Sequence, residues 1–79
     1  MALRITMNIY TIKNDIDVYD CFRAHVIVAN SEHEVRSIAK INAKDEGKDI
    51  WETARIEIIG AYTGNAIYPH IILSDFFNG

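Results

Sequence analysis

The chain has 79 residues, a formal net charge of −3 and one cysteine, and 49% of its residues are hydrophobic. This length allows one domain over residues 1–79 with a small core, and the apolar content is that of a globular protein rather than a disordered one. The charge excludes both a strongly basic nucleic-acid-binding domain and the extreme acidity of a DNA mimic.

The composition and the apolar runs also indicate the cellular compartment of the protein. A single thiol, Cys21, excludes an intramolecular disulfide, so nothing suggests an oxidising environment. The first residues lack the apolar core of a signal peptide, and the longest apolar runs are too short to span a bilayer. We therefore expect a cytoplasmic protein without membrane contact. Met7 is a second candidate start, which would make residues 1–6 a leader or an added extension.

The first part of the chain predicts a β-hairpin. Apolar and polar residues alternate with a period of two over residues 3–13, as in a half-buried strand. A polar, turn-like segment follows at 13–17, and a second strand is predicted at 19–29.

The alternation also assigns the faces of this hairpin. In the second strand, the set of residues that includes Phe22 and Val26 is assigned to the core. The phases place the following residues on the opposite face: Tyr10, Arg23, His25 and Ile27. An outer face with apolar residues in so small a chain suggests a partner or a dimer, although an antiparallel sheet also simply leaves one face in water.

An amphipathic helix is predicted from Ser31 to near Gly47. Ser31 and Glu34 form a capping box, in which the hydroxyl accepts from the amide of residue 34 and the carboxylate reaches back. Gly47 would supply the left-handed cap that ends the helix. The face at three- and four-residue spacing consists of Val35, Ile38, Ala39 and Asn42.

The second half predicts two more strands, at 54–62 with a bulge at Gly60, and at 69–74 after a turn at 62–65. Trp51 and one phenylalanine are expected in the core. The fold class is therefore α+β in the order ββαββ, with a mostly antiparallel four-stranded sheet and one amphipathic helix packed on one face.

The chain carries no recognisable catalytic, metal or nucleotide motif, so we predict no catalytic residue, no cofactor, no metal ligand and no enzymatic activity. The histidines lack the spacing of a zinc site. Asp15, Asp17 and Asp20 resemble a calcium loop, but the glycine and glutamate that an EF-hand requires are missing. Cys21 and His25 would lie about 13 Å apart along a strand, too far for direct proton transfer, which favours a buried or inert thiol.

Several segments resemble a family of small phage and prophage proteins, in which a strand ending in alanines precedes a serine-capped acidic helix. In the first half, the resemblance lies in Tyr19-Asp20, Ala24 to Ala29, and Ser31-Glu32-His33-Glu34-Val35-Arg36-Ser37-Ile38. In the second half, it lies in Trp51, Ile59-Gly60-Ala61 and Ile71-Ile72-Leu73-Ser74. The tail from Ser74 to Gly79 is similar to the family's serine-phenylalanine-asparagine-glycine ending, from which Asp75 and Phe77 depart.

This resemblance implies the context of a mobile element and, with it, the cytoplasm of the host cell. It carries over no residue roles. Proteins of that kind and size commonly bind and block a host protein, including immune nucleases such as CRISPR effectors. We therefore expect a non-enzymatic accessory protein that binds and inhibits or modulates a host protein or complex, with an anti-CRISPR-like activity as one form.

The partner-binding surface is predicted on the outer strand face and the acidic hairpin, at Tyr10, Asp15, Asp17, Tyr19, Asp20, Arg23 and His25. One alternative is a homo-oligomeric structural module, such as a homodimer that pairs sheet edges or faces. Another is a weak nucleic-acid binder that uses the helix row Arg36, Lys40 and Lys44. The acidic balance argues against nucleic acid as the partner, and such a row is more often a solvated helix face.

Overall fold

The computed structural model describes residues 6–16 and 19–77. Within these residues, four strands form one antiparallel sheet, and one α-helix accompanies it, which confirms the α+β fold in the order ββαββ. The elements are β1 (Asn8–Lys13), β2 (Cys21–Ala29), α1 (Glu32–Ile41), the short 3-10 helix η1 (Asp49–Glu52), β3 (Arg55–Ala61) and β4 (His70–Phe77). Residues 1–5 of the suggested leader lie outside the described part.

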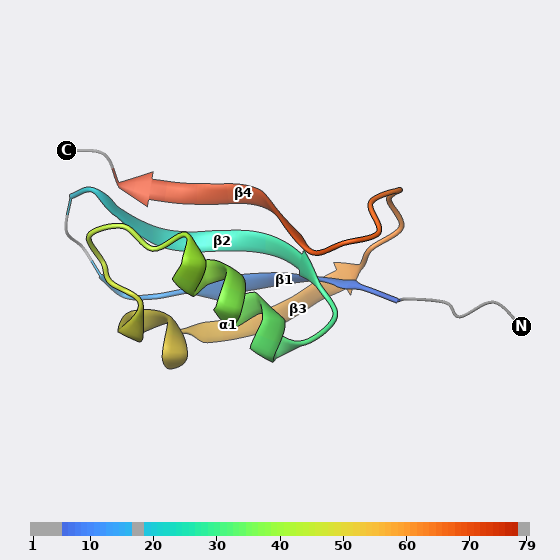
Figure 1. Cartoon of the computed structure of the whole chain (residues 1–79), viewed down its shortest axis with the longest axis horizontal. Coiled ribbons are helices and arrows are strands. Elements are labelled where there is room, and N and C mark those ends of the chain that lie inside the picture. Colours follow the sequence, from blue (N-terminus) through green and yellow to red (C-terminus); the bar gives the residue numbers. More distant parts are fainter. Residues whose placement is uncertain (1–5, 17–18, 78–79) are drawn as a thin grey trace, which may run out of the picture.

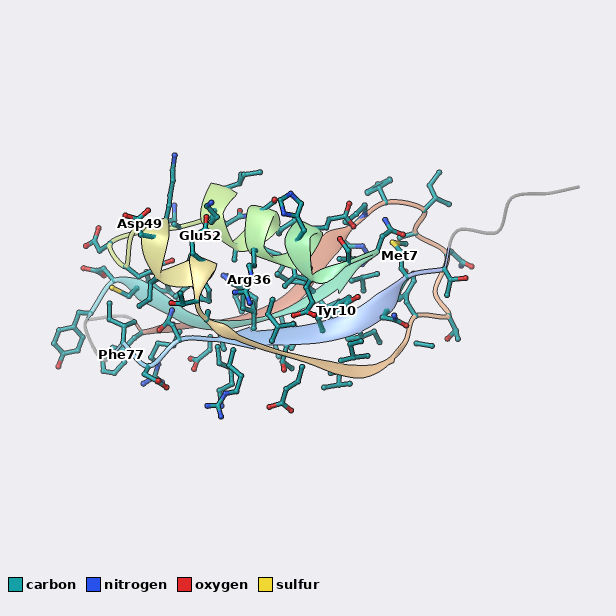
Figure 2. The ribbon with its side chains drawn as sticks, turned by 90° about the horizontal axis from the view of Figure 1, so that it is seen from below. Met7, Tyr10, Arg36, Asp49, Glu52 and Phe77 are labelled. Atoms are coloured by element: carbon teal, nitrogen blue, oxygen red, sulfur yellow. The ribbon has the colours of Figure 1, made fainter. Side chains whose placement is uncertain are left out.

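The strand order is β3-β1-β2-β4, so the β1–β2 hairpin is central and the two later strands form the edges. Helix α1 and η1 lie on the same side of the sheet, in front of it in Figure 1. Seen from below in Figure 2, they form a single upper layer, and side chains project from the lower side of the sheet with no element over them. The described part of the chain therefore has two layers, with one sheet face covered and the other uncovered.

The capping box at the helix start is confirmed, with one difference. Ser31 is the N-cap, and its hydroxyl accepts a hydrogen bond from the backbone N–H of Glu34 at 3.2 Å. The Glu34 carboxylate reaches back one residue further than predicted, to Asn30, and accepts from its backbone N–H at 2.7 Å and its side-chain amide at 3.0 Å. The first bond satisfies an N–H group that the first helical turn leaves without a partner, and the other two fix the residue that precedes the cap.

The predicted end of the helix is wrong. The helix ends at Ile41, and Asn42 is its C-cap, where the side-chain amide donates to the Ile38 carbonyl at 2.8 Å. Such local side-chain bonds compete with continuation of the helix. Gly47 does adopt a left-handed conformation, with φ of 79°, but it closes a separate turn in which its N–H donates to the Lys44 carbonyl.

The predicted strands differ from the observed strands mainly at their ends. β1 begins at Asn8, whereas the prediction began at residue 3, and residues 3–5 lie outside the described part. The bulge predicted at Gly60 is present, although the register shift makes Ile59 the extra residue. β4 continues to Phe77, so the predicted aromatic tail extends an edge strand.

The core lies between the sheet and the helix layer. Its buried cluster consists of Tyr10, Ile12, Ile27, Ala29, Val35, Ala39, Trp51 and Ala54. The prediction that Trp51 belongs to the core is confirmed, since its side chain is 0% exposed. In helix α1, Val35 and Ala39 are buried and Ile38 is half-buried, which confirms the apolar face. Asn42, also assigned to that face, is exposed as the cap.

Two charged side chains hold Trp51 in place. The carboxylate of Glu46 is only 9% exposed and accepts three N–H groups: from the Phe22 backbone at 3.0 Å, the Lys44 backbone at 3.1 Å and the Trp51 indole at 3.0 Å. Arg36 donates to the carbonyls of Trp51 and Ala54, each at 2.9 Å. Hydrogen bonds of this kind satisfy buried charges that would otherwise be unfavourable.

We predict that Ser31→Ala lowers the free energy of unfolding by about 1 kcal/mol, because the Glu34 amide loses its acceptor. Ser37→Ala is the matched control on the same helix, since its hydroxyl donates to the His33 carbonyl and caps no free amide. Urea unfolding of both variants measures the difference. Equal stabilities of the two variants would contradict the capping role.

Candidate functional site

Three residues predicted for the outer sheet face lie instead beneath the helix layer. Tyr10 is 3% exposed, His25 is 1% exposed and Ile27 is 0% exposed. The prediction of their face is therefore wrong. Since Tyr10 and His25 were also predicted as partner-binding residues, their burial removes them from the exposed surface on which a partner would rest.

An irregularity in β2 explains much of this error. The pairing of β2 with β4 shifts between Phe22 and Ala24, so Arg23 is an extra residue. Across this bulge, Phe22 and His25 lie on the same side, with ring centroids 4.8 Å apart. Strict alternation places residues three apart on opposite faces, so one bulge reverses the assignment on one side of it.

The remaining predicted residues lie at the end of the β1–β2 hairpin. Asp15, Tyr19 and Asp20 are exposed, and Asp17 lies outside the described residues. Tyr19 packs edge-on against Phe77, with ring centroids 4.9 Å apart. This region, which we call the hairpin end, is thereby joined to the last residues of β4.

Arg23 belongs to the same region. Its guanidinium lies 4.7 Å from the centre of the Phe77 ring and forms an ion pair with Asp75 at 3.3 Å. Both groups of the ion pair are partly exposed, so the pair contributes little to stability. The bulge in β2 therefore directs the Arg23 guanidinium onto the Phe77 ring at the sheet edge.

The uncovered face of the sheet is identified from the strand registers. Its members pair across strands and alternate with the core residues Tyr10, Ile12 and Ile27. From β1, β2, β3 and β4 they are Ile9, Thr11, Lys13, Ala24, Val26, Val28, Arg55, Glu57, Gly60, His70, Leu73 and Asp75. Val28 is buried, Ile9 and Val26 are half-buried, and Leu73 is 65% exposed. The face is therefore apolar along β2 and at Ile9 and Leu73, and charged along β3 and toward the hairpin end.

Two cations stand directly opposite each other on this face. Lys13 of β1 pairs with Arg55 of β3 in the register, and both side chains are exposed. Neither forms an ion pair with any described residue, although Glu57 follows two residues after Arg55 on the same face. Like charges at directly opposed positions are unfavourable. Folding alone gives no reason for this arrangement.

Two open cavities meet at Lys13, and Arg55 lines one of them. One of about 570 Å³ is lined by Lys13, Asn14, Asp15, Ile50, Thr53 and Arg55, among others. The other, of about 500 Å³, is lined by Lys13, Asp15, Arg23 and Asp75, among others. Both contain cationic and acidic side chains. They form shallow depressions beside the uncovered face, where polar groups of a partner could be received.

His25 and Ser74 are the one pair among the candidate groups with the separation of a base and a nucleophile. Nδ1 of His25 lies 2.7 Å from Oγ of Ser74. The imidazole, however, is packed between Phe22 and Trp51, with ring centroids 4.8 and 5.1 Å away, and its Nε2 has no hydrogen-bond partner among the described residues. Catalytic histidines are usually oriented by a group on the second nitrogen. The contact instead ties edge strand β4 to the core.

Two other kinds of chemistry were considered from the sequence, a reactive thiol at Cys21 and a metal site. Cys21 is buried, and its thiol donates to the Tyr19 carbonyl. Burial raises the pKa of this thiol, and nearby carboxylates raise it further, so it is held as an unreactive thiol. Within the described residues, no group of three or more His, Cys, Asp or Glu side chains could hold a metal ion.

The predicted helix row of cations is mostly engaged within the protein. Arg36 donates to two backbone carbonyls, and Lys40 pairs with Glu52, whose pKa is lowered by this hydrogen bond. Lys44 lies beyond the helix end in the following turn. These contacts leave little support for a phosphate-binding helix face.

Comparison with models of protein families, with curated proteins and with solved structures finds no match for this chain. Among the described residues, no helix has the length and apolar character needed to cross a bilayer. The assignment of a site therefore depends on the geometry alone.

Lys13 and Arg55 were missed in the sequence. Each is an ordinary charged residue at a strand end, and 42 positions separate the two in the chain. Only the β1–β3 register places them opposite each other. No local pattern in the sequence reveals this pair, because cross-strand neighbours are defined by the register of the paired strands.

The burial of His25 predicts a dependence of stability on pH. Burial lowers the pKa of His25 below its ordinary value of 6.5, and the Glu46 carboxylate offsets part of this. Below pH 6.5 the unfolded imidazole binds a proton that the folded one does not, so the free energy of unfolding falls as the pH drops through this window. Urea unfolding at a series of pH values measures this slope.

His25→Phe keeps a ring in the same place and should remove this part of the slope, whereas His33→Gln, at an exposed helix position, should retain it. A slope unchanged in His25→Phe would assign the effect to other groups.

The opposed cations predict a stabilising substitution. Lys13→Glu replaces a repulsive cross-strand pair with an attractive one opposite Arg55 and should raise the free energy of unfolding by about 0.2 to 1 kcal/mol. High salt should reduce the gain, because both groups are exposed. The double variant Lys13→Glu/Arg55→Glu restores a like-charge pair and should lose the gain. A double variant as stable as the single one would refute the pairwise repulsion.

Proposed function

We propose that this chain is a small non-enzymatic binding protein, whose partner is a protein surface held against the uncovered face and the hairpin end. In the context implied by the resemblance to phage proteins, the partner is a host protein or complex that the bound chain inhibits or modulates. Immune nucleases of the CRISPR type are one such class.

The observation that carries this proposal is the uncovered sheet face. In a two-layer fold, the second face of the sheet is free (Figure 2). Here it has the half-buried Ile9 and Val26 on the central strands and Leu73, 65% exposed, on edge strand β4. Exposed apolar surface bordered by polar groups marks interaction sites in small proteins. The apolar residues of this face on β2 and β4, beside the charges of β3 and the hairpin end, fit that description.

The charges on the face define the partner further. Lys13 and Arg55 repel each other in the free chain, and a carboxylate placed between them would relieve that repulsion. The partner surface expected to fit is therefore an apolar strip with an acidic group beside it. Charge complementarity of this kind chiefly fixes orientation and accelerates association.

The hairpin end adds residue types that often dominate binding energy. Tyr19 is 60% exposed and rests on Phe77, whose ring also lies under the Arg23 guanidinium. Tyrosine and arginine are enriched among residues that contribute most to protein interfaces. Of the partner-binding residues predicted from the sequence, this region retains Asp15, Tyr19, Asp20 and Arg23.

The test is a tagged pull-down from the bacterial host, with bound proteins identified by mass spectrometry. The unmodified chain is expected to capture a specific host protein. The double variant Lys13→Glu/Arg55→Glu should lose it, because the cationic pair becomes acidic while the repulsion between the two positions is unchanged. Lys48→Glu is the matched control, since it makes an exposed charge reversal in the loop between α1 and η1.

Equal capture by all three proteins would show that the uncovered face is not the binding surface. Recovery of the bait alone from the unmodified chain, repeated at low salt, would oppose the proposed function itself.

A further inference from the structure

The two edges of the sheet are not equivalent. An edge strand presents unpaired N–H and C=O groups that can pair with another strand, and proteins commonly protect such edges with charges and bulges. β3 carries the exposed charges Arg55 and Glu57 and a bulge at Ile59. Ile58 and Ile59 are also exposed on this strand, at 61% and 57%, so the protection of β3 depends on its two charges and its bulge.

β4 lacks most of this protection. Its eight residues include one formal charge, Asp75, and this carboxylate is paired with Arg23 of the neighbouring strand. The extra residue on β4 is Ile72, near its start, so Leu73–Phe77 is free of an insertion on the β4 side. Large apolar side chains are exposed along it, with Ile72 at 51%, Leu73 at 65% and Phe76 at 39%. This combination is an open edge.

We propose that β4 pairs with β4 of a second copy of this chain, antiparallel about a two-fold axis, and that the two sheets join into one of eight strands. A second copy is the occupant favoured by the charges, because β4 brings to the interface an apolar strand whose only carboxylate is already neutralised. Growth stops at two copies, since a two-fold interface uses the same edge of both and leaves only the protected β3 edges.

The charge also restricts the register of this interface. A pairing centred on Asp75 would oppose two carboxylates, which is unfavourable. A pairing centred on Ser74 places Asp75 beside Leu73 of the second copy and spreads the apolar side chains over both halves. The latter is the register we expect.

This inference does not rest on the proposed function, because strands pair at an edge through their backbones, although Leu73 belongs to both the edge and the uncovered face. The experiment is size-exclusion chromatography with light scattering over a wide range of concentrations. The full chain should give twice the monomer mass of 9.0 kDa. Leu73→Lys, which adds a charge to the open edge, should halve the measured mass.

Ile58→Lys is the matched control. It places the same charge on β3 at a site that is 61% exposed, and it should remain dimeric. Circular dichroism checks that each variant is folded, and Ile72→Lys repeats the test at the open edge should Leu73→Lys unfold.

A monomer mass for the unmodified chain at every concentration would overturn the proposal. So would a dimer that Ile58→Lys and Leu73→Lys disrupt equally. Loss of host-protein capture in Leu73→Lys would not separate the edge from the uncovered face, because Leu73 belongs to both, so the mass of the unmodified chain decides whether the dimer exists. If capture is lost only in Lys13→Glu/Arg55→Glu, the result tests the uncovered face, and this variant should still be dimeric.

Discussion

A buried carboxylate joins the loop after α1 and the helix η1 to strand β2, which is distant in the chain. Glu46 accepts from the β2 backbone at Phe22, from its own loop at Lys44 and from the Trp51 indole of η1. A carboxylate 9% exposed is unfavourable without such partners, and here each oxygen has at least one. The large indole is thus held over the sheet, where it packs against His25, and the imidazole in turn binds the edge strand through Ser74. Losing the Glu46 carboxylate would leave these N–H groups without their acceptor in the interior.

Much of the fold could be predicted from the sequence because its signals are local. The Ser31 cap, the apolar helix face and the four strands each appear within about a dozen residues, a length over which periodicity and capping are informative. The faces of the strands could not be predicted, since both sides of β2 are largely apolar and one bulge at Arg23 reverses the alternation. Tyr10 and His25 were assigned to the outer face by the phase of the alternation. In the structure the His25 imidazole is buried through aromatic packing and one hydroxyl. The Glu46 network and the Lys13–Arg55 pair depend on tertiary contacts and register, which no local pattern encodes.

The proposed binding face and the open edge are separate consequences of the same two-layer arrangement. One helix layer covers only one side of four strands, so the other side can serve a partner (Figure 2). The strand order leaves the late strands outermost, and only one of them is protected by charge. Joining two copies at β4 would make the uncovered faces adjacent halves of one sheet. A partner with repeated sites would then be bound at two points, with a gain that depends on their spacing.

The strand order also has a consequence for how the chain folds as it is synthesised. The central hairpin can close early, because β1 and β2 are consecutive, and α1 follows at once. β2, however, has no partner on its outer side until β4 is available, and the contact between His25 and Ser74 spans 49 residues. Closure of such distant contacts is slow. In the interval, the outer edge of β2 is exposed together with an incomplete core, a state in which chains associate wrongly. The mild negative charge of the chain and the carboxylates of its helix layer would then act as solubility aids for the nascent intermediate.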